Sequence, residues 1–169
     1  MSQLSFSSFD SLLHVRDTQG RYRLASADQI LEAAREAIEQ KFQRGASFTS
    51  PIAVKDYLRA KLAGFEHEVF AGLFLDAKHC LLEYVELFRG SINGAAVYPR
   101  EVVKEALRTN AAAVVFSHNH PSGNPEPSAA DQAITRRLKE AMDLIEVRVL
   151  DHIVIAGNQG TSFAQLGLL

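Results

Sequence analysis

Apolar residues recur with two different periods along the chain, and the change of period separates expected helices from expected strands. A period near 3.6 predicts helices over residues 26–45, 51–64, 99–109 and 128–142. Extended runs rich in Val, Leu, Ile and Phe predict strands over residues 67–75, 80–88, 92–97, 112–117 and 147–156. Residues 76–79 are turn-like, so we expect the first two strands to form a hairpin.

Helix-start signals and strand lengths turn this pattern into a fold class. Ser26 and Gln29 have capping-box spacing, and Ser50 is followed by Pro51, which favours the first position of a helix. Residues 112–117 are apolar up to Phe116, as expected of a central strand buried on both faces. Because strands and helices alternate, the pattern predicts an α/β fold with a mixed β-sheet flanked by helices. We expect residues 1–45 to form an N-terminal arm and helix, and residues 46–169 to form one domain.

Composition excludes several classes of protein. The 169 residues carry 18 Lys and Arg against 20 Asp and Glu, so no whole-molecule positive field attracts nucleic acid. The single cysteine rules out an intrachain disulfide and the Cys-rich zinc sites. The longest apolar run, Ala111–Phe116, is too short to span a membrane, and the N-terminus lacks a secretory signal pattern. These features predict a cytoplasmic protein without a membrane partner.

The stretch HNHPSGNPEPSAAD at residues 118–131 carries the candidate chemistry. His118 and His120 are two apart at the end of an expected strand, so both imidazoles can face one cation. Asp131 lies in the first turn of the next helix, where its carboxylate can return to the strand end. Three protein ligands with an open fourth position are typical of a catalytic zinc site. The alternative interpretation is structural, because Ser128 and Asp131 also have capping-box spacing.

A metal-dependent hydrolase also needs a proton acceptor, and two glutamates compete for this role. Glu66 and Glu68 are two apart and lie on the same side of the expected strand, so periodicity cannot separate them. Glu68 adjoins the apolar run from Val69 to Leu75, where a carboxylate requires a reason to be buried. This argument favours Glu68.

The chain resembles the JAMM (JAB/MPN) metalloprotease-type domain, whose signature is a distant Glu, then H-x-H-P, a loop and P-S-x-x-D. His118, His120 and Pro121 match the first block, and ten residues separate His120 from Asp131, as in that signature. The sequences HNHPSG, Tyr98–Glu101 and Asp151–Val154 are similar to the bacterial RadC branch, in its short stand-alone form, over about residues 50–169.

The resemblance implies a cytidine-deaminase-like fold and a role for each site residue. His118, His120 and Asp131 would hold one Zn²⁺ or another divalent ion. Glu68, two residues before an aromatic as in the RadC pattern, would be the general base. Ser128 would stabilise the developing oxyanion, although a helix N-cap is an equal explanation for this serine. For Asp151 and His152, packing or a local hydrogen bond is favoured over a role beside the metal ligands.

The expected function is metal-dependent hydrolysis of an amide or isopeptide bond by a JAMM-type enzyme acting through a metal-activated water. The first alternative is a DNA-repair-associated metal-dependent phosphodiesterase, opposed by the near-neutral charge. The second is a non-catalytic binding module. The sequence does not indicate which protein or peptide is the substrate, and it is compatible with a homo-oligomer. One basic cluster with an aromatic residue could contact DNA, although a solvated hairpin is favoured there: Arg16, Arg21, Tyr22 and Arg23.

Overall fold

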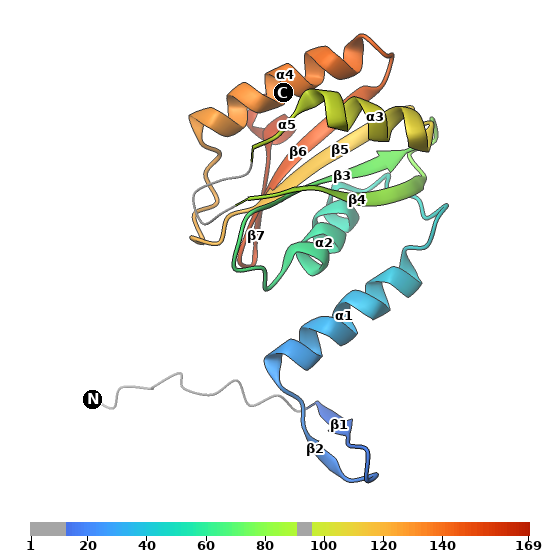
Figure 1. Cartoon of the computed structure of the whole chain (residues 1–169), viewed down its shortest axis with the longest axis vertical. Helices are drawn as coiled ribbons and strands as arrows, with labels where there is room; N and C mark the ends of the chain where they lie inside the picture. Colours follow the sequence, from blue (N-terminus) through green and yellow to red (C-terminus); the bar gives the residue numbers. More distant parts are fainter. Residues whose placement is uncertain (1–12, 91–95) are drawn as a thin grey trace, which may run out of the picture.

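A five-stranded mixed sheet forms the centre of the protein (Figure 1). The structure, a computed structural model, describes residues 13–90 and 96–169. The strand order is β4-β3-β5-β6-β7, in which only β5 and β6 are parallel. The strands of this sheet are β3 (Val69–Leu75), β4 (Leu81–Arg89), β5 (Ala113–Asn119), β6 (Arg148–Ala156) and β7 (Gln159–Ser162).

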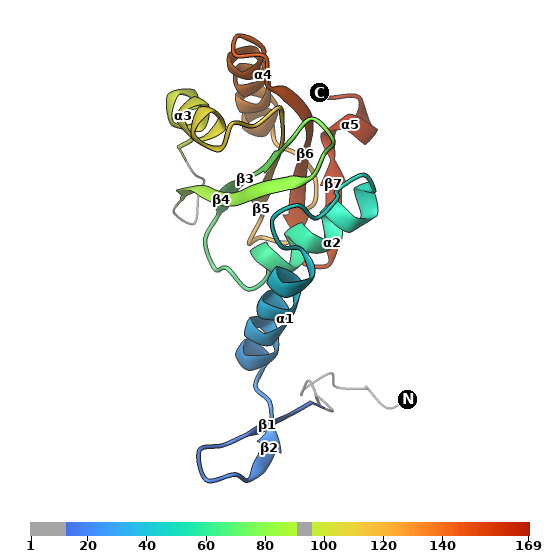
Figure 2. The ribbon, with the colours of Figure 1, turned by 90° about the vertical axis from the view of Figure 1, so that its right-hand side faces the viewer.

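Helices cover both faces of the sheet, which confirms the predicted α/β class. In Figure 2, α3 and α4 lie on one side and α2 lies on the other. The helices are α1 (Ala27–Lys41), α2 (Pro51–Leu62), α3 (Pro99–Thr109), α4 (Ala129–Asp143) and α5 (Phe163–Leu166). The predicted strand over 92–97 falls mostly on residues 91–95, outside the described residues, and residues 96 and 97 are not in a strand.

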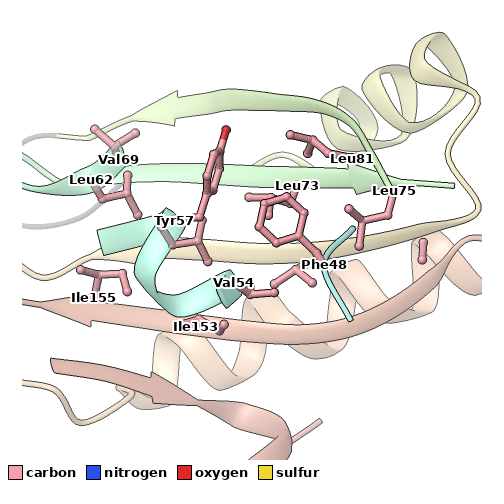
Figure 3. Close-up of a cluster of buried hydrophobic side chains, with 13 residues drawn as sticks. Phe48, Val54, Tyr57, Leu62, Val69, Leu73, Leu75, Leu81, Ile153 and Ile155 are labelled. Atoms are coloured by element: carbon pink, nitrogen blue, oxygen red, sulfur yellow. The ribbon is translucent and has the colours of Figure 1, made fainter. Parts of the chain in front are cut away.

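The apolar core has two parts because β3 and β5 are buried along their whole length. Alternate side chains point to opposite faces, so one set packs under α2 and the other under α3 and α4. Figure 3 shows the first part, in which Val54 and Tyr57 of α2 lie over Leu73 and Ile153 of the sheet. The second part holds Phe70 and other side chains beneath α3 and α4: Phe74, Val114, Phe116, Leu138 and Met142.

A register shift between β5 and β6 changes which face the second half of β6 presents. Val114 pairs with Val149, but Val115 pairs with Asp151, so Leu150 is an extra residue in β6. Because a strand's side chains alternate, one extra residue exchanges the two faces beyond it. His152 therefore faces the side covered by α4, whereas Asp151 faces the α2 side. No local pattern in the sequence predicts this exchange.

The N-terminal part extends away from the sheet (Figures 1 and 2). A two-stranded hairpin, β1 (His14–Arg16) and β2 (Tyr22–Leu24), precedes α1. This agrees with the short hairpin considered for the first 25 residues, of which 1–12 lie outside the described residues. The end of α1 joins the domain through Phe42, whose ring stacks on Phe48 at 5.1 Å and meets the edge of Tyr57 at 5.5 Å.

The C-terminal end contains two elements that the sequence pattern did not predict, β7 and α5. Asp151 links them to β6, because its carboxylate accepts hydrogen bonds from the Ser162 hydroxyl and from the Ala164 amide. The favoured interpretation of Asp151 as a residue with a local hydrogen-bonding role agrees with this contact. Among the described residues, no helix combines the length and apolar character needed to cross a bilayer.

Candidate metal centre

Three side chains converge where β5 ends and α4 begins. The Nε2 atoms of His118 and His120 are 2.9 Å apart. The Asp131 carboxylate faces both rings, with Oδ1 at 3.4 Å from His118 Nε2 and Oδ2 at 3.5 Å from His120 Nε2. Within the described residues, this is the one group of His, Cys, Asp and Glu side chains close enough to share a cation.

The secondary structure explains this convergence. Along β5, Val114 and Phe116 face the α4 side, so the alternation also directs His118 to that side. His120 follows the last residue of β5 and its amide still donates to the carbonyl of Ile155 in β6. The loop then turns back, and Asp131 enters from the first turn of α4. The predicted extended arrangement of the two histidines therefore agrees with the structure.

A backbone carbonyl fixes the orientation of the His120 ring. His120 Nδ1 lies 2.7 Å from the Asn124 carbonyl oxygen, which can only accept. Nδ1 therefore carries a proton, and in the neutral ring Nε2 has a free lone pair. Gly123 makes this return of the chain possible, because its φ of +78° closes a turn in which its amide donates to the His120 carbonyl.

The electrostatics of the centre favour a cation. Burial raises the pKa of Asp131, but the adjoining His118 and His120 rings outweigh this effect and hold the pKa well below its usual value. The Asp131 carboxylate in turn raises the pKa of His120. These shifts have one cause, which is that a carboxylate and two imidazoles face each other in a site with little solvent. Positive charge placed among them is stabilised.

The two interpretations of Asp131, capping residue and metal ligand, are compatible in the structure. Asp131 Oδ2 accepts a hydrogen bond of 2.7 Å from the Ser128 amide, and the Ser128 hydroxyl accepts one of 3.1 Å from the Asp131 amide. This capping box starts α4 and holds the carboxylate toward the histidines. The N-cap interpretation of Ser128 is thus correct, and a catalytic role for its hydroxyl hydrogen stays a prediction.

His152 has a larger part in the site than the sequence analysis favoured. Its Nε2 atom lies 2.8 Å from His118 Nδ1, and the side chain is fully buried. Burial lowers the pKa of His152 well below its ordinary value. The favoured interpretation of His152, packing or a local hydrogen bond, is therefore incomplete, because the ring directly contacts a candidate metal ligand.

The structure separates the two candidate glutamates. Glu68 immediately precedes β3, is half-buried, and lines a hollow of about 400 Å³ together with His120, Ser128 and Asp131. Glu68, His120 and Ser128 also line a neighbouring hollow of about 290 Å³. Among the described residues, Glu66 is exposed and lines neither of these two hollows. The geometry thus brings Glu68 to the metal centre and leaves Glu66 outside.

Asn119, between the two histidines, holds the segment that carries Glu68. Its side-chain oxygen accepts from the Val69 amide at 2.8 Å, and its side-chain nitrogen donates to the His67 carbonyl at 3.0 Å. These contacts flank Glu68 on both sides. The sequence analysis assigned no role to Asn119, although a polar residue at the end of a buried strand signals that its amide has buried partners.

The donor set fits a small divalent cation. Zinc binds imidazole nitrogen and carboxylate oxygen at about 2.0–2.2 Å, which places tetrahedral ligands roughly 3.3–3.5 Å apart. The two ring-to-carboxylate distances are close to this spacing and end on different oxygens of Asp131, and the distance between the rings is shorter. Arg137, which makes no ion pair with any described residue, adds a positive charge to the hollow.

Comparisons with known proteins agree with this architecture. The sequence profile described as RadC-like JAB domain matches residues 48–168. A UPF0758 protein of Vibrio cholerae is 57% identical over 141 residues, covering 83% of this chain and 89% of its own length. A UPF0758 protein of Marinobacter nauticus is 51% identical over 150 residues, covering 89% of this chain and 67% of its own length. The chain therefore belongs to the RadC-like JAB domain family.

Proposed function

We propose that this protein is a metal-dependent hydrolase of the JAMM type that cleaves an amide or isopeptide bond, with zinc as its metal. The observation that carries the proposal is the convergence of His118, His120 and Asp131, whose ligand atoms lie within 4.8 Å of one another. Two neutral imidazoles and a carboxylate suit zinc, although other divalent ions accept the same donors. A bound ion supplies Lewis-acid polarisation of the scissile carbonyl and acidifies water.

Glu68 is the proton carrier in this proposal. Its carboxylate shares the hollow with His120, and a half-buried position keeps it in contact with solvent. A carboxylate in this place can accept a proton from the attacking water and deliver it to the leaving nitrogen. The two hydrogen bonds of Asn119 hold the backbone on either side of Glu68.

Ser128 is the proposed donor to the developing oxyanion. Its hydroxyl oxygen accepts the capping hydrogen bond from Asp131, but this contact leaves the hydroxyl hydrogen available. Ser128 also borders both hollows that contain Glu68 and His120. A donor in this position would stabilise negative charge on the carbonyl oxygen.

Metal analysis of the purified protein and of three variants tests the proposal. We expect about one ion per chain in the wild type and its loss in His118→Ala, because one of three protein ligands is removed. Glu68→Gln should keep the ion and lose about 10²–10⁴-fold in turnover of a fluorogenic peptide and isopeptide library. Glu66→Gln is the matched control, with the same change two residues away and outside the hollow, and should resemble the wild type.

Two sets of results would contradict the proposed hydrolase and favour one of the two alternatives. A wild-type protein that binds no divalent ion, or that binds one but cleaves neither peptide, isopeptide nor DNA, would favour a binding module. Cleavage of single-stranded DNA without peptide cleavage, abolished by His118→Ala and Glu68→Gln, would establish the phosphodiesterase alternative.

A further inference from the structure

We propose that His152 and Thr135 are positioning residues that fix the orientation and the tautomer of His118, so that its Nε2 lone pair faces the cation. This inference rests on the proposed metal site. It concerns a buried histidine that the hydrolytic chemistry does not itself use, since His152 lies behind His118 and is 0% exposed.

Three phenylalanine rings surround the buried ring of His152. Its ring stacks on Phe163 at 4.6 Å and meets the edges of Phe70 at 5.3 Å and Phe116 at 6.4 Å. The extra residue in β6 turns this ring toward α4 and His118. Aromatic packing therefore restrains the ring, while its two nitrogens point to polar partners on β5 and α4.

The direction of each hydrogen bond in the series from His118 to Asp131 follows from its last acceptor, the Asp131 carbonyl. The Asp131 carbonyl oxygen can only accept, so the Thr135 hydroxyl donates its single hydrogen to it over 2.5 Å. Thr135 Oγ1 must then accept from His152 Nδ1, which lies 2.6 Å away. His152 is therefore protonated on Nδ1.

This assignment determines the state of His118 when a cation is bound. A neutral His152 protonated on Nδ1 presents a lone pair at Nε2, and His118 Nδ1 donates to it across 2.8 Å. His118 then carries its proton on Nδ1 and its free lone pair on Nε2, the atom facing Asp131 and His120. Partners of this kind orient metal-binding histidines and raise their basicity.

The two ligand histidines are thus restrained by different means. His120 donates directly to the Asn124 carbonyl, whereas His118 reaches a carbonyl through His152 and Thr135. The second route ends on Asp131, whose carboxylate faces His118. This closed series of contacts links β5, β6 and the first turns of α4. A substitution of Thr135 should therefore change the affinity for the metal.

Zinc affinity of the full chain, measured by competition with a chromophoric chelator, tests the inference. Thr135→Val removes the acceptor for His152 Nδ1 at nearly constant volume and should weaken zinc binding by about 10–100-fold. Thr135→Ser keeps the hydroxyl and should stay within about threefold of the wild type, our threshold for a negligible change relative to that loss. Thr109→Val is the matched control, because Thr109 makes the same hydroxyl-to-carbonyl contact with Glu105 on α3.

The ¹⁵N shifts of the imidazole rings give a readout that a purely structural role would not move. In the wild-type zinc complex we expect protonated Nδ1 and unprotonated Nε2 for both His118 and His152. This measurement decides the question even if Thr135→Val fails to fold. His152 protonated on Nε2, or zinc affinity unchanged in folded Thr135→Val, would overturn this inference alone. A wild type that binds no zinc would overturn it together with the proposed function.

Discussion

Asp131 shows how one side chain can serve folding and chemistry together. Its carboxylate accepts from the Ser128 amide and thereby starts α4, and the same group faces His118 and His120. The capping contact at the helix start thus contributes to the position of the carboxylate. The same contact that starts α4 therefore also holds the carboxylate toward the two histidines of the candidate metal site.

Replacing Asp131 by Asn and by Ala should separate these two roles. Asn keeps an oxygen for the Ser128 amide but loses the charge, so zinc should bind at least about tenfold more weakly, about 1.4 kcal/mol. Ala also leaves that amide without its acceptor, and the metal-free protein should lose about 1–3 kcal/mol of unfolding free energy. Chelator competition and urea denaturation measure the two effects. Equal unfolding free energies for both variants would contradict the capping role.

At the scale of elements, the site depends on how the start of β3 is held against the end of β5. Phe70 pairs with His118 in the antiparallel ladder, which places Glu68 beyond the last paired residues. Asn119 continues the connection past the ladder by bonding to His67 and Val69. The position of Glu68 thus depends on strand pairing and on one amide side chain.

Asn119→Ala should therefore affect both stability and the position of Glu68. The buried Val69 amide loses its acceptor, which should cost about 1–3 kcal/mol of unfolding free energy. Under the proposed function, turnover should fall while zinc stays bound, because the three metal ligands are unchanged. Urea denaturation and metal analysis of the same preparation measure these effects. Loss of zinc with unchanged stability would show that Asn119 acts on the histidines instead.

At the scale of the whole molecule, the sheet and its helices carry the site, while the β1–β2 hairpin lies away from it (Figure 1). Phe42 after α1 contacts Phe48 and Tyr57 and so belongs to the packing on the α2 side. Tyr22 and Leu24 of the hairpin are instead 73% and 58% exposed. The predicted boundary at residue 45 follows the chain pattern, but the packing of Phe42 reaches across it.

Removing the exposed hairpin and replacing the packed Phe42 should therefore have different effects on the unfolding free energy. Removing residues 1–24, which keeps the buried Ala25, should change the unfolding free energy by less than about 1 kcal/mol, because most of the described side chains removed are exposed and such changes have small effects. Phe42→Ala removes a half-buried ring with two aromatic partners and should cost about 2 kcal/mol. Urea denaturation at constant zinc compares the two proteins. A larger loss from the truncation would mean that the hairpin supports the domain.

The helices and strands with a clear period could be predicted from the sequence, and so could the set of candidate metal ligands. These features are local, because a period of 2 or 3.6 is set by a single element, and the H-x-H spacing is read within one strand. The same local reasoning narrowed the general base to two glutamates and favoured Glu68, and it left the N-cap and catalytic interpretations of Ser128 open.

Contacts between residues from distant segments could not be predicted in this way, because they depend on how the chain folds. Glu68 rather than Glu66 borders the hollow because β3 pairs with β5 in one particular register. His152 lies behind His118 because the extra residue in β6 exchanges the faces of that strand. Strand register and bulges arise from pairing between segments far apart in the chain, and no local pattern of apolar and polar residues contains that information.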